Sequence, residues 1–183
     1  MVVSSRSKTL VAVAEKLDLS LQEDEKFPCK FHDKITELEL EKIFSITREN
    51  MQFYYDACND ETWEWNDLKK LRELQSIKNR FIIHRIEGQI SGFLVFRFMI
   101  DCGDPVAYIW EIQVESESAG KGIGSQMMDK LESFLRERTA IRKIVLTVLK
   151  NNERAIKFYQ NRGYTEDKSS PQSACYWILS RTI

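Results

Sequence analysis

The sequence contains few of the residues that build metal centres, catalytic triads or flexible linkers. It has two histidines, His32 and His84, and four cysteines that all lie far from one another. This spacing argues against a zinc site, and the isolated histidines argue against a Ser–His–Asp triad. The cysteines are instead expected to be free, buried thiols in a reducing compartment. Seven glycines and three prolines form no linker-like stretch, so we expect no internal linker.

The sequence also lacks a large excess of either charge and has no long apolar runs. Lysine and arginine number 27 against 28 acidic residues, which argues against bulk-charge binding to nucleic acid. A basic peptide remains possible as a partner, because a local acidic groove would attract it. No apolar run approaches the roughly 18 residues of a membrane span, and residues 1–19 do not resemble a signal peptide. We therefore expect no membrane and no direct nucleic-acid partner.

What the chain does have is enough apolar residues for one core: 43% of 183 residues are hydrophobic. Hydrophobic spacing predicts helices over 10–19, 37–58, 67–77, 122–138 and 153–161, with Asp67 as the N-cap of the third. It predicts strands over 80–86, 90–98, 107–114 and 143–149, and two short strands near 164–166 and 175–180. This order predicts a mixed α/β domain with one central sheet.

Three glycines lie in five positions between the third strand and its helix, in the run Ala-Gly-Lys-Gly-Ile-Gly-Ser at 119–125. Backbone N–H groups and the helix dipole at such a turn bind phosphate oxygens, although a plain glycine turn is the structural alternative. A P-loop would need Ser or Thr where Gly122 stands. A dinucleotide fingerprint is nearly matched, but the acid expected about twenty residues later is missing.

A third pattern fits better. The acetyl-CoA loop of the GNAT acetyltransferase superfamily reads Arg/Gln-x-x-Gly-x-Gly/Ala, which the run from Ala119 through Gly122 to Gly124 resembles except at its first position. A second signature of that superfamily is matched by Asn152, Ala155, Tyr159, Gly163 and Tyr164. The resemblance implies a single GNAT-type domain, with a mixed sheet flanked by helices, that uses acetyl-CoA and no metal.

Residues 27–183 also resemble a narrower group, the NatD-type N-terminal acetyltransferases, and leave 1–26 as an N-terminal helical extension. The matching segments are 50–52 with Tyr55, 63–65, 96–98, 102–104, 146–148, 169–171 and 178–181. That family acetylates the α-amine of histones 4 and 2A, which begin Ser-Gly-Arg-Gly. The resemblance implies basic histone tails as partners, and we expect a monomer in the cytoplasm and nucleus.

The resemblance assigns the cofactor to three places. Pantetheine would lie along a splayed third strand at Ile112, Gln113 and Val114, with a backbone N–H near Ile112 facing the thioester oxygen. Asn152 would reach the cofactor from the other side. The pyrophosphate would bind the glycine turn, at Gly120, Lys121, Gly122, Ile123, Gly124 and Ser125.

Glu111 precedes the pantetheine residues on a strand that is otherwise apolar. It is either a salt-bridged strand carboxylate or, as the resemblance implies, the general base for the incoming amine. A base role requires partial desolvation, because an unperturbed glutamate is a weak base. Tyr159 either protonates the departing thiolate, as in many GNAT enzymes, or packs against the cofactor.

The resemblance also implies an acceptor pocket. Its walls would be Tyr55, Tyr108, Trp110 and Tyr176, which as generic aromatics would otherwise be core, with further contacts from Thr147 and Ser169. Asp101 would pair with the tail arginine, while Met99 replaces a second family acid. Glu61 and Glu64 either form a negative rim or face solvent. A different amine acceptor and a non-catalytic GNAT-fold binding module remain alternatives, because fold alone does not name an acceptor.

Overall fold

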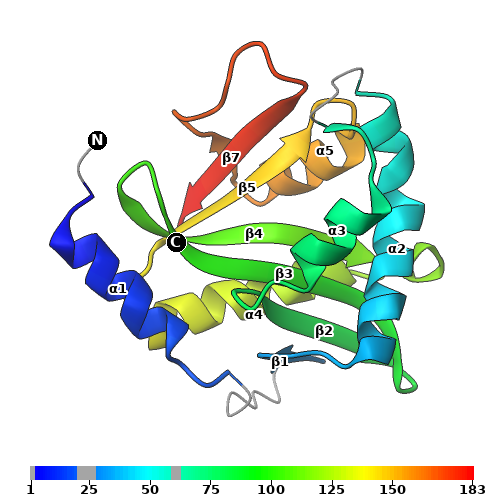
Figure 1. Ribbon diagram of the computed structural model, residues 1–183, viewed down its shortest axis with the longest axis horizontal. Helices are drawn as coiled ribbons and strands as arrows, with labels where there is room; N and C mark the ends of the chain where they lie inside the picture. The colour runs from blue at the N-terminus through cyan, green and yellow to red at the C-terminus, as the bar shows by residue number, and fades with distance from the viewer. Residues whose placement is uncertain (1–2, 20–27, 59–62) are drawn as a thin grey trace.

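The computed structural model describes residues 3–19, 28–58 and 63–183 (Figure 1). Its helices are α1 (Ser5–Glu15), α2 (Glu37–Asp56), α3 (Asp67–Leu74), α4 (Ile123–Arg138) and α5 (Glu153–Asn161), with a short 3-10 turn at Ser116–Ser118. Its strands are β1 (Cys29–His32), β2 (Arg80–Ile86), β3 (Gln89–Asp101), β4 (Asp104–Val114), β5 (Lys143–Leu149), β6 (Thr165–Glu166) and β7 (Tyr176–Thr182). None of the helices in these ranges is long and apolar enough to cross a bilayer.

The strands form one mixed sheet in the order β1-β2-β3-β4-β5-β7-β6. Only β4 and β5 are parallel, and the connection between them runs through α4. The buried side chains of α2 and α3 pack on one face of the sheet, and those of α1, α4 and α5 pack on the other. The predicted fold class, a mixed sheet flanked by helices, is confirmed.

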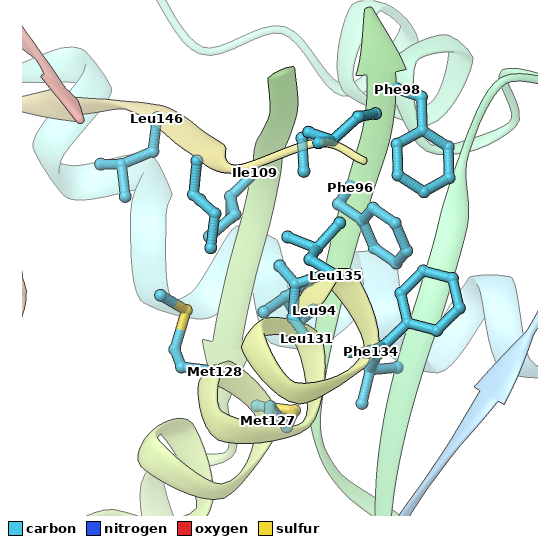
Figure 2. Packing of buried hydrophobic residues seen from close by; sticks show 14 of the residues in the cluster. Leu94, Phe96, Phe98, Ile109, Met127, Met128, Leu131, Phe134, Leu135 and Leu146 are labelled. Carbon is cyan, nitrogen blue, oxygen red and sulfur yellow. The ribbon is translucent and has the colours of Figure 1, made fainter. Parts of the chain in front are cut away.

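The core on the α4 face positions the start of that helix. Figure 2 shows Met127, Leu131 and Phe134 of α4 against Leu94 and Phe96 of β3. A Cβ on Gly92 of β3 would lie 2.9 Å from the Ile123 side chain, so glycine permits this close approach. The first turn of α4 is therefore fixed beside the end of β4.

Local polar contacts fix the first residues of α2 and α3, and the cap of α3 differs from the one predicted from the sequence. Thr36 and Glu39 form a capping box at the start of α2. The N-cap of α3 is Asn66, whose side chain accepts a hydrogen bond from the Lys69 N–H at 2.9 Å; the prediction of Asp67 was wrong. The Asp67 carboxylate instead accepts a hydrogen bond from the Trp65 indole at 2.6 Å.

The sequence analysis also underestimated the β-structure. It missed β1, whose four residues pair with β2 at one end of the sheet. The β3–β4 hairpin is longer than predicted, because Cys102 and Gly103 both take positive φ angles (47° and 93°) and form a tight two-residue connection. Asp101 therefore ends a strand beside Asp104.

The N-terminal extension packs on the domain. Val11, Ala14 and Leu19 are buried in the α4-face core, and the Ser7 hydroxyl donates a hydrogen bond to the Gly103 carbonyl at 3.0 Å. The helix is therefore part of the folded unit and braces the β3–β4 turn. The predicted boundary between residues 26 and 27 lies outside the described residues.

A matched pair of valines tests this packing. Val11 is 9% exposed and Val13 is 59% exposed on the same helix. Val11→Ala should lower the free energy of unfolding by about 1–3 kcal/mol, because it removes buried methyl groups. Val13→Ala should change it by less than about 0.5 kcal/mol. Urea denaturation measures both values, and equal losses would contradict the docking of α1.

Candidate active site

The parallel pair β4 and β5 separates halfway along its length. The two strands pair only from Val106 to Ile109 and from Lys143 to Leu146. Beyond these residues β4 runs on to Val114 beside β3, while β5 runs on to Leu149 beside β7, so the strands diverge (Figure 1). A cavity of about 1020 Å³ lies at this separation and is lined by both strands and by α2, α3, α4 and α5. Backbone groups of β4 are thereby available to an extended ligand arm.

A bulge in β4 places Glu111 in the cavity. Val95 of β3 pairs with Glu111 and the next residue, Phe96, pairs with Ile109, so Trp110 is the extra residue. Side chains two apart on a regular strand share a face. The bulge breaks this rule: Ile109 points into the α4-face core, and Glu111 shares the α2/α3 face with Val95. Arg97 stacks over the extra tryptophan, with its guanidinium carbon 3.7 Å from the ring centre.

The Glu111 carboxylate has two polar partners. One oxygen accepts a hydrogen bond from the Lys70 ammonium at 2.9 Å, and the other accepts one from the Gln113 amide at 2.9 Å. Only 6% of the glutamate side chain is exposed. Glu111 is thus a buried, ion-paired carboxylate, as one of the two sequence interpretations expected, and it also lines the cavity.

An aromatic wall stands over this carboxylate. The rings of Tyr55 and Trp63 lie 5.6 Å apart, and those of Trp63 and Tyr176 lie 4.7 Å apart. Trp65 meets Tyr55 edge-on at 5.4 Å. Trp63 therefore connects Tyr55 of α2 to Tyr176 of β7, and both tryptophans, to which the sequence analysis gave no individual role, line the cavity.

A second cluster lies on the same face toward the β3–β4 turn. The hydroxyls of Tyr108 and Thr147 are 2.6 Å apart, and burial raises the pKa of Tyr108. Asp101 contributes to that rise, so its charge is close to the phenol. One oxygen of Asp101 is buried without a hydrogen-bond partner, and burial raises the pKa of the carboxyl. Asp101, for which the sequence predicted an arginine contact, thus has an unsatisfied acceptor oxygen.

Ser169 belongs to the surroundings of this cluster. Its hydroxyl donates a hydrogen bond to Asp167 at 2.8 Å, and Asp167 pairs with Lys143 at 2.8 Å. Burial opposes ionisation of Asp167, but the bonds from Lys143, Ser180 and Ser169 outweigh it and hold its pKa well below the ordinary value. Ser169 therefore acts here by fixing a neighbouring acid.

The glycine turn lines the cavity at the start of α4. Gly120 and Gly122 have φ angles of 78° and 79°, and a Cβ at either residue would meet no atom within 4 Å. Gly122 is the N-cap of α4 and supplies no side chain to the first N–H groups of that helix. These donors face a space that can take an anion, which fits the pyrophosphate of acetyl-CoA.

Most of the predicted site residues lie together. The cavity is lined by Tyr55, Tyr108, Trp110, Glu111, Ile112, Gln113, Val114, Gly120, Gly122, Ile123, Gly124, Ser125, Thr147, Asn152 and Tyr159. Asp101, Lys121, Ser169 and Tyr176 are not among its lining residues. Glu64 lines it, and Glu61 lies outside the described residues.

Two of the predicted cofactor residues have other partners in the structure. The Asn152 side chain caps α5 by accepting a hydrogen bond from the Ala155 N–H at 3.1 Å. The Gln113 side chain is held between Glu111 and Asn50, which leaves its backbone for a ligand. Burial and the charge of Glu111 raise the pKa of Tyr159, so its phenol stays protonated.

An uncapped helix start that suits an anion, a split between parallel strands and a buried carboxylate are together the features expected of an acyl-CoA-dependent transferase site. Comparison with known proteins agrees. The family model for the acetyltransferase (GNAT) family matches residues 40–164, and the chain belongs to this family.

Individual relatives share parts of the sequence or the fold. N-alpha-acetyltransferase 60 of Danio rerio is 34% identical over 97 residues, which are 52% of this chain and 38% of that protein. The chain spans about half or less of the length of the curated relatives it matches.

Solved structures share the fold at low identity. The PaiA N-acetyltransferase of Thermoplasma acidophilum, in complex with coenzyme A, has a TM-score of 0.64 at 16% identity, over 85% of this chain and 99% of its own. Arabidopsis thaliana NAA60, in complex with a bisubstrate analogue, has a TM-score of 0.59 at 13% identity, over 85% and 98%.

Two glycines with the same backbone conformation test the anion site. Gly122→Asp should sharply weaken acetyl-CoA binding, because its carboxylate would stand where the pyrophosphate meets the α4 donors. Gly88 has a φ angle of 81° and equally open surroundings in the β2–β3 turn, so Gly88→Asp carries the same backbone strain. Calorimetry with acetyl-CoA compares the two variants. Equal affinities would contradict the assignment of the glycine turn.

Proposed function

We propose that this chain transfers the acetyl group of acetyl-CoA to the N-terminal α-amine of a protein, with Glu111 as the general base. The proposed acceptors are the tails of histones 4 and 2A that begin Ser-Gly-Arg-Gly, modified by a monomer in the cytoplasm and nucleus. The observation that carries the proposal is a set of polar groups on the α2/α3 face of the sheet. The buried carboxylate of Glu111 and the paired hydroxyls of Tyr108 and Thr147 line the cavity, and Asp101, beyond the lining, has a buried oxygen without a partner.

The chemistry requires a neutral amine held against a polarised thioester. Acetyl-CoA supplies the acetyl group as a thioester. Glu111 receives the proton that the amine loses, directly or through one water, and the carboxylate is buried enough to be held in one orientation. The protonated phenol of Tyr159 lines the same cavity and is a proton donor for the departing sulfur.

An α-amine suits this site better than a lysine side chain. The α-amine has an ordinary pKa near 8, against about 10.4 for lysine, so far more of it is neutral at physiological pH. A chain end has backbone N–H and C=O groups beside its amine, whereas a lysine side chain has only an alkyl stem there. The aromatic wall and the Tyr108–Thr147 pair offer polar groups to such a backbone. The relationship to N-alpha-acetyltransferase 60 supports this choice.

Two peptides test the proposed acceptor. A Ser-Gly-Arg-Gly peptide should be acetylated once, at its first nitrogen. A longer version with a blocked N-terminus and free lysines should be nearly inert. Mass spectrometry reads both results, and Glu111→Gln should lower kcat on the first peptide by about 10²–10⁴ at neutral pH. Comparable acetylation of the blocked peptide would show that the pocket reads lysine.

Asp101 tests the specificity for a tail arginine. Asp101→Ala should raise KM about 10–100-fold for Ser-Gly-Arg-Gly and much less for Ser-Gly-Ala-Gly, because a hydrogen bond to a charged group contributes about 1.5–3 kcal/mol. Asp104 provides the control: its side chain is 65% exposed at the same turn, and Asp104→Ala should affect both peptides alike. Equal losses on both peptides for Asp101→Ala would refute the contact with arginine.

A further inference from the structure

A buried lysine on α3 contacts the proposed base, and the sequence analysis assigned it no role. The Lys70 side chain is 6% exposed, and its ammonium has three oxygen partners. It donates to Glu111 at 2.9 Å, to Glu73 at 2.9 Å and to the Tyr55 hydroxyl at 3.1 Å. All three donors of the ammonium are therefore used.

We propose that Lys70 is a positioning residue that keeps Glu111 ionised and oriented toward the amine, and that Glu73 limits this effect by competing for the same ammonium. The inference rests on the proposed function of Glu111 as the base. It deepens that function by naming the groups that set the pH range in which the base can work.

The Glu111 carboxylate is held in one orientation by two neighbours. Lys70 holds one oxygen of Glu111 and Gln113 holds the other, so the carboxylate cannot rotate freely. Gln113 is itself fixed, because Asn50 donates a hydrogen bond to its amide oxygen at 3.1 Å. Each carboxylate oxygen still has a lone pair for an amine or a water. The base is thus pre-organised from α2, α3 and β4 together.

Lys70 also places a positive charge beside the Glu111 carboxylate. A buried carboxylate without a counter-ion would take up a proton and could not act as a base. Burial by itself would lower the pKa of Lys70, but Glu111 and its other partners raise it well above the ordinary value, so the lysine stays charged. Lys70, Glu73 and Glu111 carry two negative charges and one positive charge, which leaves the cluster able to accept one proton.

Among the described residues, Tyr55, Tyr159 and Arg97 are further titratable groups near the cluster, and none of them is hydrogen-bonded to the Glu111 carboxylate. Burial and the charge of Glu111 raise the pKa of Tyr55 to about 12 and also raise the pKa of Tyr159, so both phenols are neutral. Arg97 of β3 is stacked on Trp110 and donates to the Glu73 backbone carbonyl at 3.0 Å. In the part of the chain that the structure describes, Lys70 is the cation that bonds directly to Glu111.

Substitutions of Lys70 and of Glu73 should therefore shift the pH at which Glu111 is protonated in opposite directions. Lys70→Met removes the nearby positive charge and keeps an unbranched stem, so protonation of Glu111 should move to higher pH. Glu73→Gln removes the competing carboxylate and leaves the ammonium to Glu111, so protonation should move to lower pH. If Lys70 had only a structural role, the two substitutions would not shift the protonation of Glu111 in opposite directions.

The experiment is a ¹³C NMR titration of the Glu111 carboxyl carbon in the full chain, with the resonance assigned by its loss in Glu111→Gln. Relative to wild type, Lys70→Met should raise the midpoint by about one pH unit or more, and Glu73→Gln should lower it measurably. Arg72 is exposed on the same helix, so Arg72→Met controls for loss of a positive charge on α3 and should leave the midpoint unchanged.

A midpoint in Lys70→Met equal to that of wild type would overturn the inference. If Lys70→Met does not fold, Glu73→Gln decides alone, and an unchanged or raised midpoint in that variant overturns the inference. This titration needs no acceptor, so its outcome is independent of whether the histone-tail peptide is a substrate. In kinetics with an accepted peptide, the acidic limb of kcat should move in the same directions, while KM for acetyl-CoA stays near the wild-type value.

Discussion

The change of strand pairing at Trp110 is the constraint on which the site depends. Before this residue β4 is bonded to β5, and after it β4 is bonded to β3 alone. The same point carries the bulge that turns Glu111 away from the α4-face core. One extra residue in one strand therefore opens the cavity, makes the β4 backbone available to a ligand and directs the carboxylate into the opening. A regular β4 would bury Glu111 among apolar side chains of the opposite face.

Burying that carboxylate creates an electrostatic problem, which the α2–α3 unit solves. An isolated buried carboxylate is unstable in its charged form, so its environment must contain a counter-ion or a donor. Asn66 starts α3 so that Lys70 reaches Glu111, and the buried Leu74 at the end of the helix fixes α3 on the sheet. The Arg97 guanidinium links the same unit to Trp110 through the Glu73 carbonyl. Arg97 thus connects the bulge at Trp110 to the ion cluster of Lys70, Glu73 and Glu111.

The sequence predicted the parts of the molecule that depend on local pattern. The strands at 80–86 and 143–149 and the helix at 153–161 match, because each has a clear hydrophobic period and a defined end. The glycine turn could be located from the sequence because it is a run of consecutive residues between a strand and a helix. The strand β1 was missed because four residues give no readable period, and the N-cap at Asn66 was missed because Asn and Asp are both good caps.

The acceptor half of the site depends on contacts that no local pattern contains. Lys70 lies 41 residues before Glu111, and Thr147 lies 39 residues after Tyr108, yet each pair is hydrogen-bonded. In the sequence Lys70 is one lysine beside another, Lys69, on a charged helix, and nothing local marks it as buried. The predicted cofactor half, by contrast, is centred on neighbouring residues at 120–125, which a local motif can specify. The proposed acceptor half takes its side chains from α2, α3, β3, β4, β5 and β7, so its specificity would depend on several elements that are distant in the sequence. This difference explains why sequence motifs identify the donor of the acetyl group more firmly than its recipient.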